Sequence, residues 1–510
     1  MTPLAAGGTY RKCGDRVGNF LHNVKVVCSI GHVKIVNRPV GAINYPMNND
    51  STQVSRRLAE FAARAKFADL PANVVVDTRR AILDWLGSAL AGALEPAARI
   101  AQQIVATLGA SDQATVFGAG RSAAANAALA NGVASHILEL DDVHKGSTLH
   151  AAAPIIPAAL AVAEREHRSG KDFILAVALG YDAAFRIGEA VNPSHYRFWH
   201  PTGTAATFGA AVAAGSLLRL SETAMLHALG SAGTQAAGLW EFNADGAMSK
   251  HLHPGKAAFN GVLAADLARL GFTGATRILE GDRGFFRATS TAFDATRVIH
   301  QLGTHWKVSE NCYKLHSCCG HTHSAIDVAL DYRAGGDHRV AELDSVDIAT
   351  YASGYEIVKE PNPRTPYQAK FSLAYCVAAA LIEGRVGLEQ FTPSRFSDHG
   401  VTDAAVSTLL ERIRITVDPE ITARYPAQWG TRIRFTRRDG STTELRAAFP
   451  VGNPENPVSA RVLEEKFRAL VAVRLGSDIA DRAIAAVGAL EQCLDMATLF
   501  ADLVPTSIAN

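Results

Sequence analysis

The sequence predicts a mainly α-helical protein in which a large all-helical domain is interrupted by a smaller α+β domain. Apolar residues recur with the helical period from about residue 52 to about residue 305, and alternating, strand-like patterns follow them. Helical patterns return after Pro450. At 510 residues the chain also exceeds the length at which one core usually stops growing. We therefore expect a poorly ordered N-terminal extension at 1–50, a helical domain at 51–309 that resumes at 450–510, and an inserted α+β lid domain at 310–449.

The first long helix is predicted between Pro71, which suits a helix start, and Gly92, which suits a helix end. The apolar residues that share one face of it are Val75, Ile82, Leu83, Leu86 and Leu90. Further helices are predicted at about 96–108, 121–138, 154–168, 171–190, 203–218, 221–237 and 255–270.

The α+β domain is predicted from two alternating segments and a hairpin. Residues 346–350 alternate between apolar and polar side chains, and so do residues 413–417. Asp439-Gly440 supplies the positive φ of a tight turn between strands at 433–435 and 443–445. Helices are predicted at about 323–334 and 370–384, so strands and helices share this layer.

Composition excludes several classes of partner. The 50 Lys and Arg residues balance 49 Asp and Glu residues, so no overall field favours nucleic acid or a membrane surface. Seven scattered cysteines predict reduced thiols in a cytoplasmic protein. The longest uncharged run, 198–218, is rich in Gly and Ala, so no transmembrane helix is predicted. We expect neither a nucleic acid nor a membrane as a partner.

The segment 139–150 carries the most unusual chemistry. Three carboxylates, two histidines and a lysine stand between two strongly apolar stretches. Ionisable groups at the end of a buried helix lose water and shift their pKa values, as catalysis requires. The alternative is a charged loop that joins two core helices.

Three further segments place Lys and His ahead of predicted helices: 196–203, 249–256 and 314–323. The N-terminal end of a helix attracts anions, so these segments predict one anion site assembled from several loops. The alternatives are a structural histidine at His200, which precedes a proline, and solvated helix-end charges at Lys250 and Lys256.

Two cofactor alternatives are weaker. A metal could be held by His316, Cys318, Cys319, His321 and His323, or by Asp141, Asp142, His144 and His150. Neither spacing matches a zinc pattern. The stretch 118–123 mimics a dinucleotide-binding fingerprint, but no βαβ unit surrounds it. We therefore expect no metal and no organic cofactor.

The motifs together make the chain resemble the MmgE/PrpD family, which includes 2-methylcitrate dehydratases, cis-aconitate decarboxylases and iminodisuccinate epimerases. The matching segments, in family order, are 140–144 with His150, 198–205, 238–242, 250–256, 318–327, 369–373 and 452–457. The resemblance implies a helical domain interrupted by an α+β lid, a homodimer, and no required cofactor.

Position by position, the resemblance places the active-site residues of the decarboxylase branch at Glu139, Val143, His150, His200, Lys250 and Lys314. The decarboxylase pattern has Asp at the position of Glu139 and Thr at that of Val143, and one residue fewer between Asp142 and His150. The methylcitrate dehydratase signature His-Pro-Ser-Asp-Asn is replaced by His150-Ala-Ala-Ala-Pro154.

The sequence thus predicts a cofactor-independent lyase of the dehydratase type. It would remove a proton next to a carboxylate of a small di- or tricarboxylate. Epimerisation and decarboxylation of a related polycarboxylate are the alternatives, and more distant ones are a Cys/His metallohydrolase and a non-catalytic carboxylate-binding protein. The predicted catalytic residues are His150, His200, Lys250, Lys314, Asp141 and Asp142. The predicted substrate-binding residues are Glu139, Val143, His144, His253 and Lys256.

Overall fold

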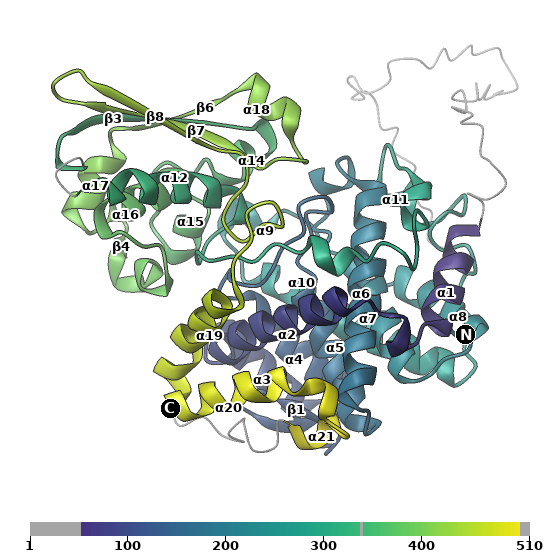
Figure 1. The fold of residues 1–510 in the computed structure, drawn as a ribbon. Helices are drawn as coiled ribbons and strands as arrows, with labels where there is room; N and C mark the ends of the chain where they lie inside the picture. The colour runs from purple at the N-terminus through teal and green to yellow at the C-terminus, as the bar shows by residue number, and fades with distance from the viewer. Residues whose placement is uncertain (1–52, 337–339, 500–510) are drawn as a thin grey trace, which may run out of the picture. The chain divides into compact units, whose positions relative to one another are not determined.

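Long helices build the first part of the fold, as the periodicity predicts (Figure 1). The computed structural model describes residues 53–336 and 340–499, which are mainly α-helical, and the extension predicted at 1–50 lies outside them. The helices of the first part are α1 (Val54–Arg64), α2 (Ala72–Gly92), α3 (Pro96–Thr107), α4 (Ala124–His136), α5 (Ala152–Arg165), α6 (Gly170–Val191), α7 (Ala205–Leu217), α8 (Glu222–Gly233), α9 (Phe242–Asp245), α10 (Ser249–Arg269) and α11 (Phe285–Thr289).

Small residues let the central helices approach backbone to backbone. A Cβ atom at Gly132 in α4 would lie only 2.7 Å from the Cα atom of Gly255 in α10. A Cβ atom at Gly209 in α7 would lie 2.5 Å from the carbonyl oxygen of Gly180 in α6. Only glycine fits such crossings. The crossing of α4 and α10 brings the end of one helix near the first turns of the other.

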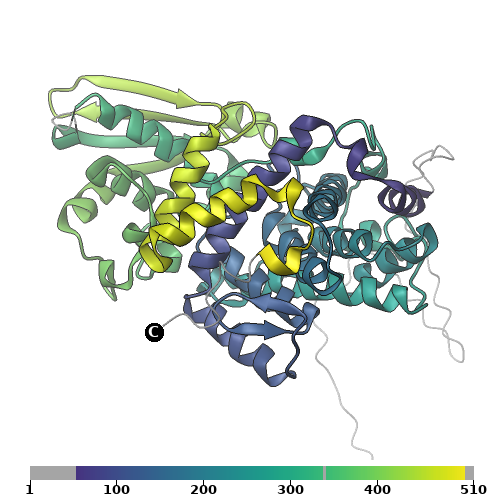
Figure 2. The same ribbon diagram turned by 60° about the horizontal axis from the view of Figure 1, so that its bottom comes forward.

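The C-terminal helices pack against the first part of the fold. They are α19 (Ala460–Leu475), α20 (Ser477–Gly488) and α21 (Met496–Leu499), and Figure 2 shows them in yellow beside the purple α2. A Cβ atom at Gly87 in α2 would lie 3.0 Å from the ring of Phe467. The ammonium of Lys466 donates to the carboxylate of Asp84 at 2.6 Å. These helices therefore share the helical core.

The α+β part has a hydrophobic core of its own. Its four-stranded sheet has the order β6-β3-β7-β8, with β6 parallel to β3 and the other pairs antiparallel. Helices α12 and α16 lie on one side of this sheet (Figure 1). The main elements are β3 (Leu343–Thr350), β6 (Ile413–Val417), β7 (Thr431–Arg437), β8 (Thr442–Ala447), α12 (His323–Ala334), α14 (Ala352–Val358), α15 (Pro366–Lys370), α16 (Leu373–Glu383), α17 (Ala404–Leu410) and α18 (Pro419–Arg424).

Several predicted elements are confirmed and some boundaries are wrong. The predicted hairpin is the pair β7–β8, with Ile433 opposite Leu445. The stretch that mimics a dinucleotide fingerprint forms a small antiparallel hairpin, β1 (Ala114–Val116) and β2 (Gly120–Ser122), so it is no phosphate loop. The helix predicted at 255–270 begins at Ser249 and contains Pro254. Lys250 therefore lies on the helix, not ahead of it.

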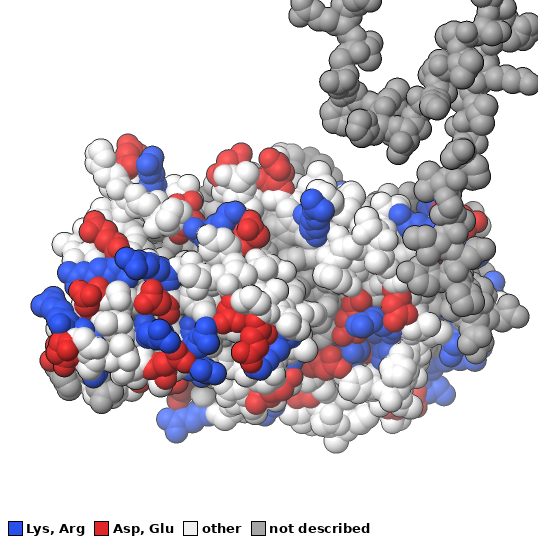
Figure 3. All heavy atoms as spheres, turned by 90° about the horizontal axis from the view of Figure 1, so that it is seen from above, with Lys and Arg blue, Asp and Glu red and all other residues white. Residues whose placement is uncertain are grey.

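Charges of both signs are interleaved on the face of the molecule shown in Figure 3. None of the helices within residues 53–336 and 340–499 has the length and apolarity that a bilayer crossing requires.

Candidate active site

Glu139 is held between two lysines in the interior. Its carboxylate contacts the ammonium of Lys250 on α10 and accepts a hydrogen bond from Lys314 at 3.2 Å. All three side chains are buried. Glu139 follows α4 with a φ of 57°, in the left-handed region that a non-glycine residue rarely adopts. Three distant segments thus converge on one buried carboxylate, and a strained backbone presents it.

The charges of this group support one another. Burial favours the neutral form of Glu139, but Lys250 and then Lys314 outweigh burial, so its pKa lies well below the usual value. Burial would likewise lower the pKa of Lys314, yet Glu139 reverses this and raises it. Glu139 is therefore ionised at neutral pH, and Lys314 beside it keeps its ammonium charge.

Histidines surround this ion group. The ring centres of His150 and His200 lie 6.3 Å apart, and that of His136 lies 4.8 Å from the first and 5.7 Å from the second. The Nδ1 atom of His253 lies 3.1 Å from the Nδ1 atom of His200, and the ring centre of His251 lies 6.1 Å from that of His136. We call these five histidines, with Glu139, Asp141, Lys250 and Lys314, the histidine–lysine cluster.

The protonation of His150 follows from its partner. Its Nδ1 atom lies 2.6 Å from the backbone carbonyl oxygen of Asp142, and a carbonyl can only accept. Nδ1 of His150 therefore carries a proton and donates it, and Nε2 is the ring nitrogen that remains for a substrate. Burial, above all, lowers the pKa of His200 well below its usual value, so the ring of His200 is neutral. A neutral imidazole can take up a proton.

The two aspartates of the 139–150 segment have different surroundings. Asp141 lies 2.7 Å from Nδ1 of His136, and the histidines hold its pKa well below the usual value although burial alone would raise it. Asp142 accepts hydrogen bonds from Tyr181 at 2.6 Å and from Asn311 at 2.8 Å. Burial raises the pKa of Asp142 to about 6. Asp141 thus orients the histidine rings, and Asp142 fixes the backbone carbonyl that holds His150.

Four buried polar atoms of this region have no hydrogen-bond partner among the described residues. They are Nε2 of His136, Oδ1 of Asp141, Nδ1 of His251 and the hydroxyl oxygen of Tyr367. Buried polar atoms are nearly always paired, because an unpaired one costs about 1–3 kcal/mol. Their concentration beside Lys250 and Lys314 indicates a place for a polar ligand.

Aromatic side chains wall the cluster. Trp240 packs edge-on against His200 at 5.0 Å, and the ammonium of Lys250 lies 4.8 Å from the ring centre of Phe371. A cavity of about 360 Å³ is lined by Tyr196 and Trp240 and, from the α+β part, by Ser353, Glu356, Ile357 and Tyr425.

Two family models match the chain: the MmgE/PrpD N-terminal domain at residues 56–297 and the MmgE/PrpD C-terminal domain at residues 316–492. The chain belongs to the MmgE/PrpD family. It is 29% identical to the cis-aconitate decarboxylase-like protein oryM of Aspergillus oryzae, over 89% of this chain and 98% of that protein. It is 29% identical to the cis-aconitate decarboxylase of Homo sapiens, over 87% of this chain and 94% of that protein. It is 25% identical to the 2-methylcitrate dehydratase-like protein oryR of Aspergillus oryzae, over 44% of this chain and 46% of that protein.

Besides Asp142, which supports His150, three predicted site residues of this family member lie outside the cluster. Val143 pairs its backbone with Cys312 and packs in a small apolar group with Tyr351 and Trp429. Lys256 is half-buried on α10 and forms no hydrogen bond or ion pair with another described residue. His144 belongs to a separate ion network, described next.

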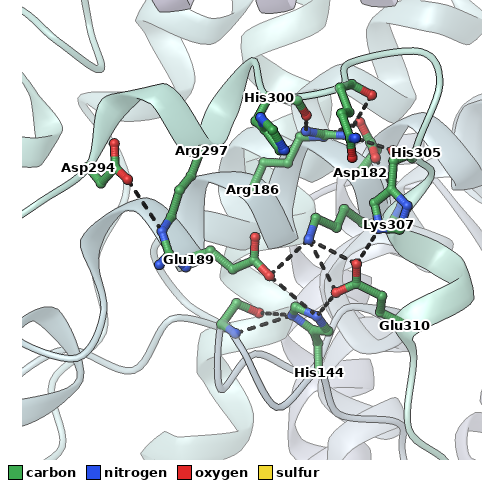
Figure 4. Close-up of polar contacts among 12 residues, drawn as sticks. His144, Asp182, Arg186, Glu189, Asp294, Arg297, His300, His305, Lys307 and Glu310 are labelled. Carbon is green, nitrogen blue, oxygen red and sulfur yellow. Dashed lines mark hydrogen bonds and ion pairs between the residues drawn. The ribbon is translucent and has the colours of Figure 1, made fainter. Parts of the chain in front are cut away.

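The separate network is centred on Lys307 (Figure 4). Nε2 of His144 donates to Glu310 at 3.0 Å, and the ammonium of Lys307 lies 3.1 Å from Glu189 and 3.0 Å from Glu310. The ring of His144 stacks on Phe185 at 4.1 Å. We call His144, Glu189, Lys307 and Glu310 the Lys307 network. It ties the 139–150 segment to α6 and to the segment that leads to Lys314.

Two groups of described residues have ligand atoms close enough for a metal. One is His136, Asp141 and His150, and the other is His144, Glu189 and Glu310. In the second group the ammonium of Lys307 already bridges both carboxylates. The Cys/His segment forms no such group among the described residues, because its side chains turn to different partners: His316 to Asp327, and His321 to Tyr351.

Sequence reasoning missed His136, His251 and Tyr367. His136 ends a buried, alanine-rich helix three residues before Glu139, and that position was a usable signal. His251 adjoins Lys250 on α10. Tyr367 comes from α15 in the α+β part, more than a hundred residues after His251, and nothing in the local sequence marks it.

Proposed function

We propose that this protein is a cofactor-independent lyase that removes a proton from the carbon next to a carboxylate of a small di- or tricarboxylate. The observation that carries the proposal is the convergence of two buried ammonium groups on one carboxylate, among neutral histidines. Each ammonium has three donors, and Glu139 takes one from each. The remaining donors can bind a substrate carboxylate.

In the proposed reaction His150 is the base. Its free Nε2 atom accepts the proton, while Lys250 and Lys314 stabilise the enolate-like charge that develops on the substrate carboxylate. The proton held by His150 then returns to the substrate or goes to a leaving group, and neutral His200, hydrogen-bonded to His253, can pass it on. A positioned acid–base pair of this kind contributes about 10²–10⁴-fold to the rate.

The relatives favour two reaction branches. The decarboxylase-named proteins match along nearly the whole chain, and the dehydratase-like protein matches along less than half of it. Elimination and decarboxylation both need a stabilised negative charge beside a carboxylate. We keep elimination as the leading branch, with decarboxylation of a cis-aconitate-like tricarboxylate as the second candidate and epimerisation as the third.

We also propose that the inserted part, residues 310–449, acts as a lid over the cluster. Lys314 lies near its start and binds Glu139 of the helical part. A bound carboxylate would bridge the same two parts and favour their closed arrangement. Hydrogen exchange in 340–449 should slow when a ligand is added, and equal exchange with and without ligand would contradict the lid.

We also propose that the protein is a homodimer in the cytoplasm. Phe198, Leu239, Met248 and Leu252 expose about half of their surface beside the segments that carry His200 and Lys250, and such patches often mark interfaces. Light scattering should give twice the mass of one chain, and a monomer at micromolar concentration would contradict it.

The proposal is tested by a screen of citrate-like, aconitate-like and malate-like acids. At least one acid should be consumed by the wild type, and Lys250→Ala should weaken its binding because one of two ammonium groups is lost. Consumption of none of these acids, with no binding of any, would overturn the proposal.

A further inference from the structure

Two of the unpaired atoms lie on different parts of the fold and face the same cluster. His251 follows Lys250 in the first turn of α10, and Tyr367 lies in α15. Their ring centres are 6.4 Å apart at an angle of 71°. Neither Nδ1 of His251 nor the hydroxyl of Tyr367 has a hydrogen-bond partner among the described residues, so the two atoms do not satisfy one another.

The pair adjoins the lysines that we assign to the substrate carboxylate. Tyr367 stacks on Phe371 at 4.9 Å, and the ammonium of Lys250 lies 4.8 Å from the ring centre of Phe371. His251 directly follows Lys250 on α10, and its ring centre lies 6.1 Å from that of His136. A ligand held by Lys250 and Lys314 would therefore extend past this pair.

Both groups are uncharged at neutral pH. Burial lowers the pKa of His251 to about 3, and His136 and Lys250 add to that shift. Burial raises the pKa of Tyr367 far above its usual value, and Glu139 adds to it. Tyr367 therefore keeps its proton and donates, and His251 offers one nitrogen that accepts.

We propose that His251 and Tyr367 form a neutral subsite that binds a hydroxyl group of the substrate, beside the cationic subsite of Lys250 and Lys314. The inference rests on the proposed function and narrows its substrate class to hydroxy-polycarboxylates. A hydroxyl suits the pair because its oxygen accepts from Tyr367 while its proton goes to His251. A carboxylate would suit the pair less well, because it only accepts and would leave the accepting nitrogen of His251 without a donor.

Citrate and tricarballylate give a matched pair of probes, since both carry three carboxylates and differ by one hydroxyl. Calorimetry should show that the wild type binds citrate about tenfold more tightly, because a site built for a hydroxyl leaves buried polar atoms unpaired without it. Tyr367→Phe should bring the two affinities within about twofold of each other, mainly by weakening the binding of citrate. His251→Phe, which keeps a ring, should act in the same way.

Tyr355→Phe is the control, since Tyr355 lies half-buried on α14 and outside the cluster. It should keep the wild-type ratio of affinities, and all variants should unfold at a temperature close to that of the wild type. Equal wild-type affinities for the two probes, or a ratio that survives in Tyr367→Phe, would overturn the hydroxyl subsite while leaving the carboxylate site intact. Binding of neither probe, nor of malate or succinate, would overturn the proposed function itself.

Discussion

Two groups of histidine, carboxylate and lysine side chains adjoin the 139–150 segment, and they differ in how completely their polar atoms are paired. In the Lys307 network every buried side-chain nitrogen and oxygen has a partner among the described residues. In the histidine–lysine cluster His136, Asp141 and His251 each leave one such atom unpaired. Glu310 and Lys307 also keep contact with solvent, whereas Glu139, Lys250 and Lys314 do not. Similar residue types thus serve structure in one place and leave room for a ligand in the other.

The largest expected effect comes from breaking the buried ion group. Glu139→Ala should destabilise the fold by about 3–5 kcal/mol, because it leaves the buried ammonium groups of Lys250 and Lys314 without the carboxylate that they share. Chemical denaturation measures this loss. Lys307→Ala in the partly exposed Lys307 network should cost clearly less. Equal losses of unfolding free energy in the two variants would contradict the proposed difference between the histidine–lysine cluster and the Lys307 network.

Histidine substitutions should separate catalysis from stability. His150→Ala should lower kcat by about 10²–10⁴-fold with little change in stability, because its role is proton transfer. His144→Ala should leave kcat within about tenfold of the wild type and reduce stability by about 1–2 kcal/mol, because Glu310 loses a hydrogen-bond partner. Steady-state kinetics and urea denaturation check both variants. The reverse pattern would move the active site to the Lys307 network.

Acid should weaken the cluster through its buried neutral histidines. The pKa of His251 falls from an ordinary value near 6.5 to about 3 on folding, so between these values the unfolded chain binds more protons. Stability is fully present above about pH 6.5 and declines as the pH falls toward 3. His251→Phe should remove up to about 1.4 kcal/mol per pH unit from that decline. Urea denaturation at pH 7, 6 and 5 measures the slope, and an unchanged slope would contradict a buried neutral His251.

Chelation should have the smallest effect. Each of the two groups offers three side chains that could hold a metal. In one group the ammonium of Lys307 already bridges the two carboxylates, and in the other Nδ1 of His136 is already hydrogen-bonded to Asp141. Dialysis against EDTA is expected to leave activity and melting temperature unchanged. A stoichiometric metal in the purified protein, with activity lost on its removal, would contradict the cofactor-independent mechanism.

The sequence predicts the helices and the β7–β8 hairpin because periodicity and turn chemistry act locally. It does not predict the start of α10, because Pro254 resembles a break ahead of a helix when it lies inside one. It places Lys250, Lys314, His150 and His200 in one site through shared local patterns. It cannot show that His144 belongs to the Lys307 network and His150 to the histidine–lysine cluster, because the two residues are only six positions apart in one segment.

The sequence also does not predict that Tyr367 lies at the site. Its approach to His251 depends on how the α+β part packs on the helical part, and no spacing in the sequence encodes that contact. His136 reaches the cluster because α4 and α10 cross closely at Gly132 and Gly255. Two single glycines in the sequence do not predict that these two helices cross.

Proton abstraction at the carbon next to a carboxylate is the central claim, and deuterium tests it most directly. The wild type and His150→Ala would be incubated in D₂O with each acid that the wild type consumes, and the products followed by proton NMR. We predict that the wild type loses the hydrogen next to the carboxylate, or incorporates deuterium there, and that His150→Ala does so at least about 100-fold more slowly. Consumption of the acid with that hydrogen fully retained, at equal rates in the two proteins, would contradict the account.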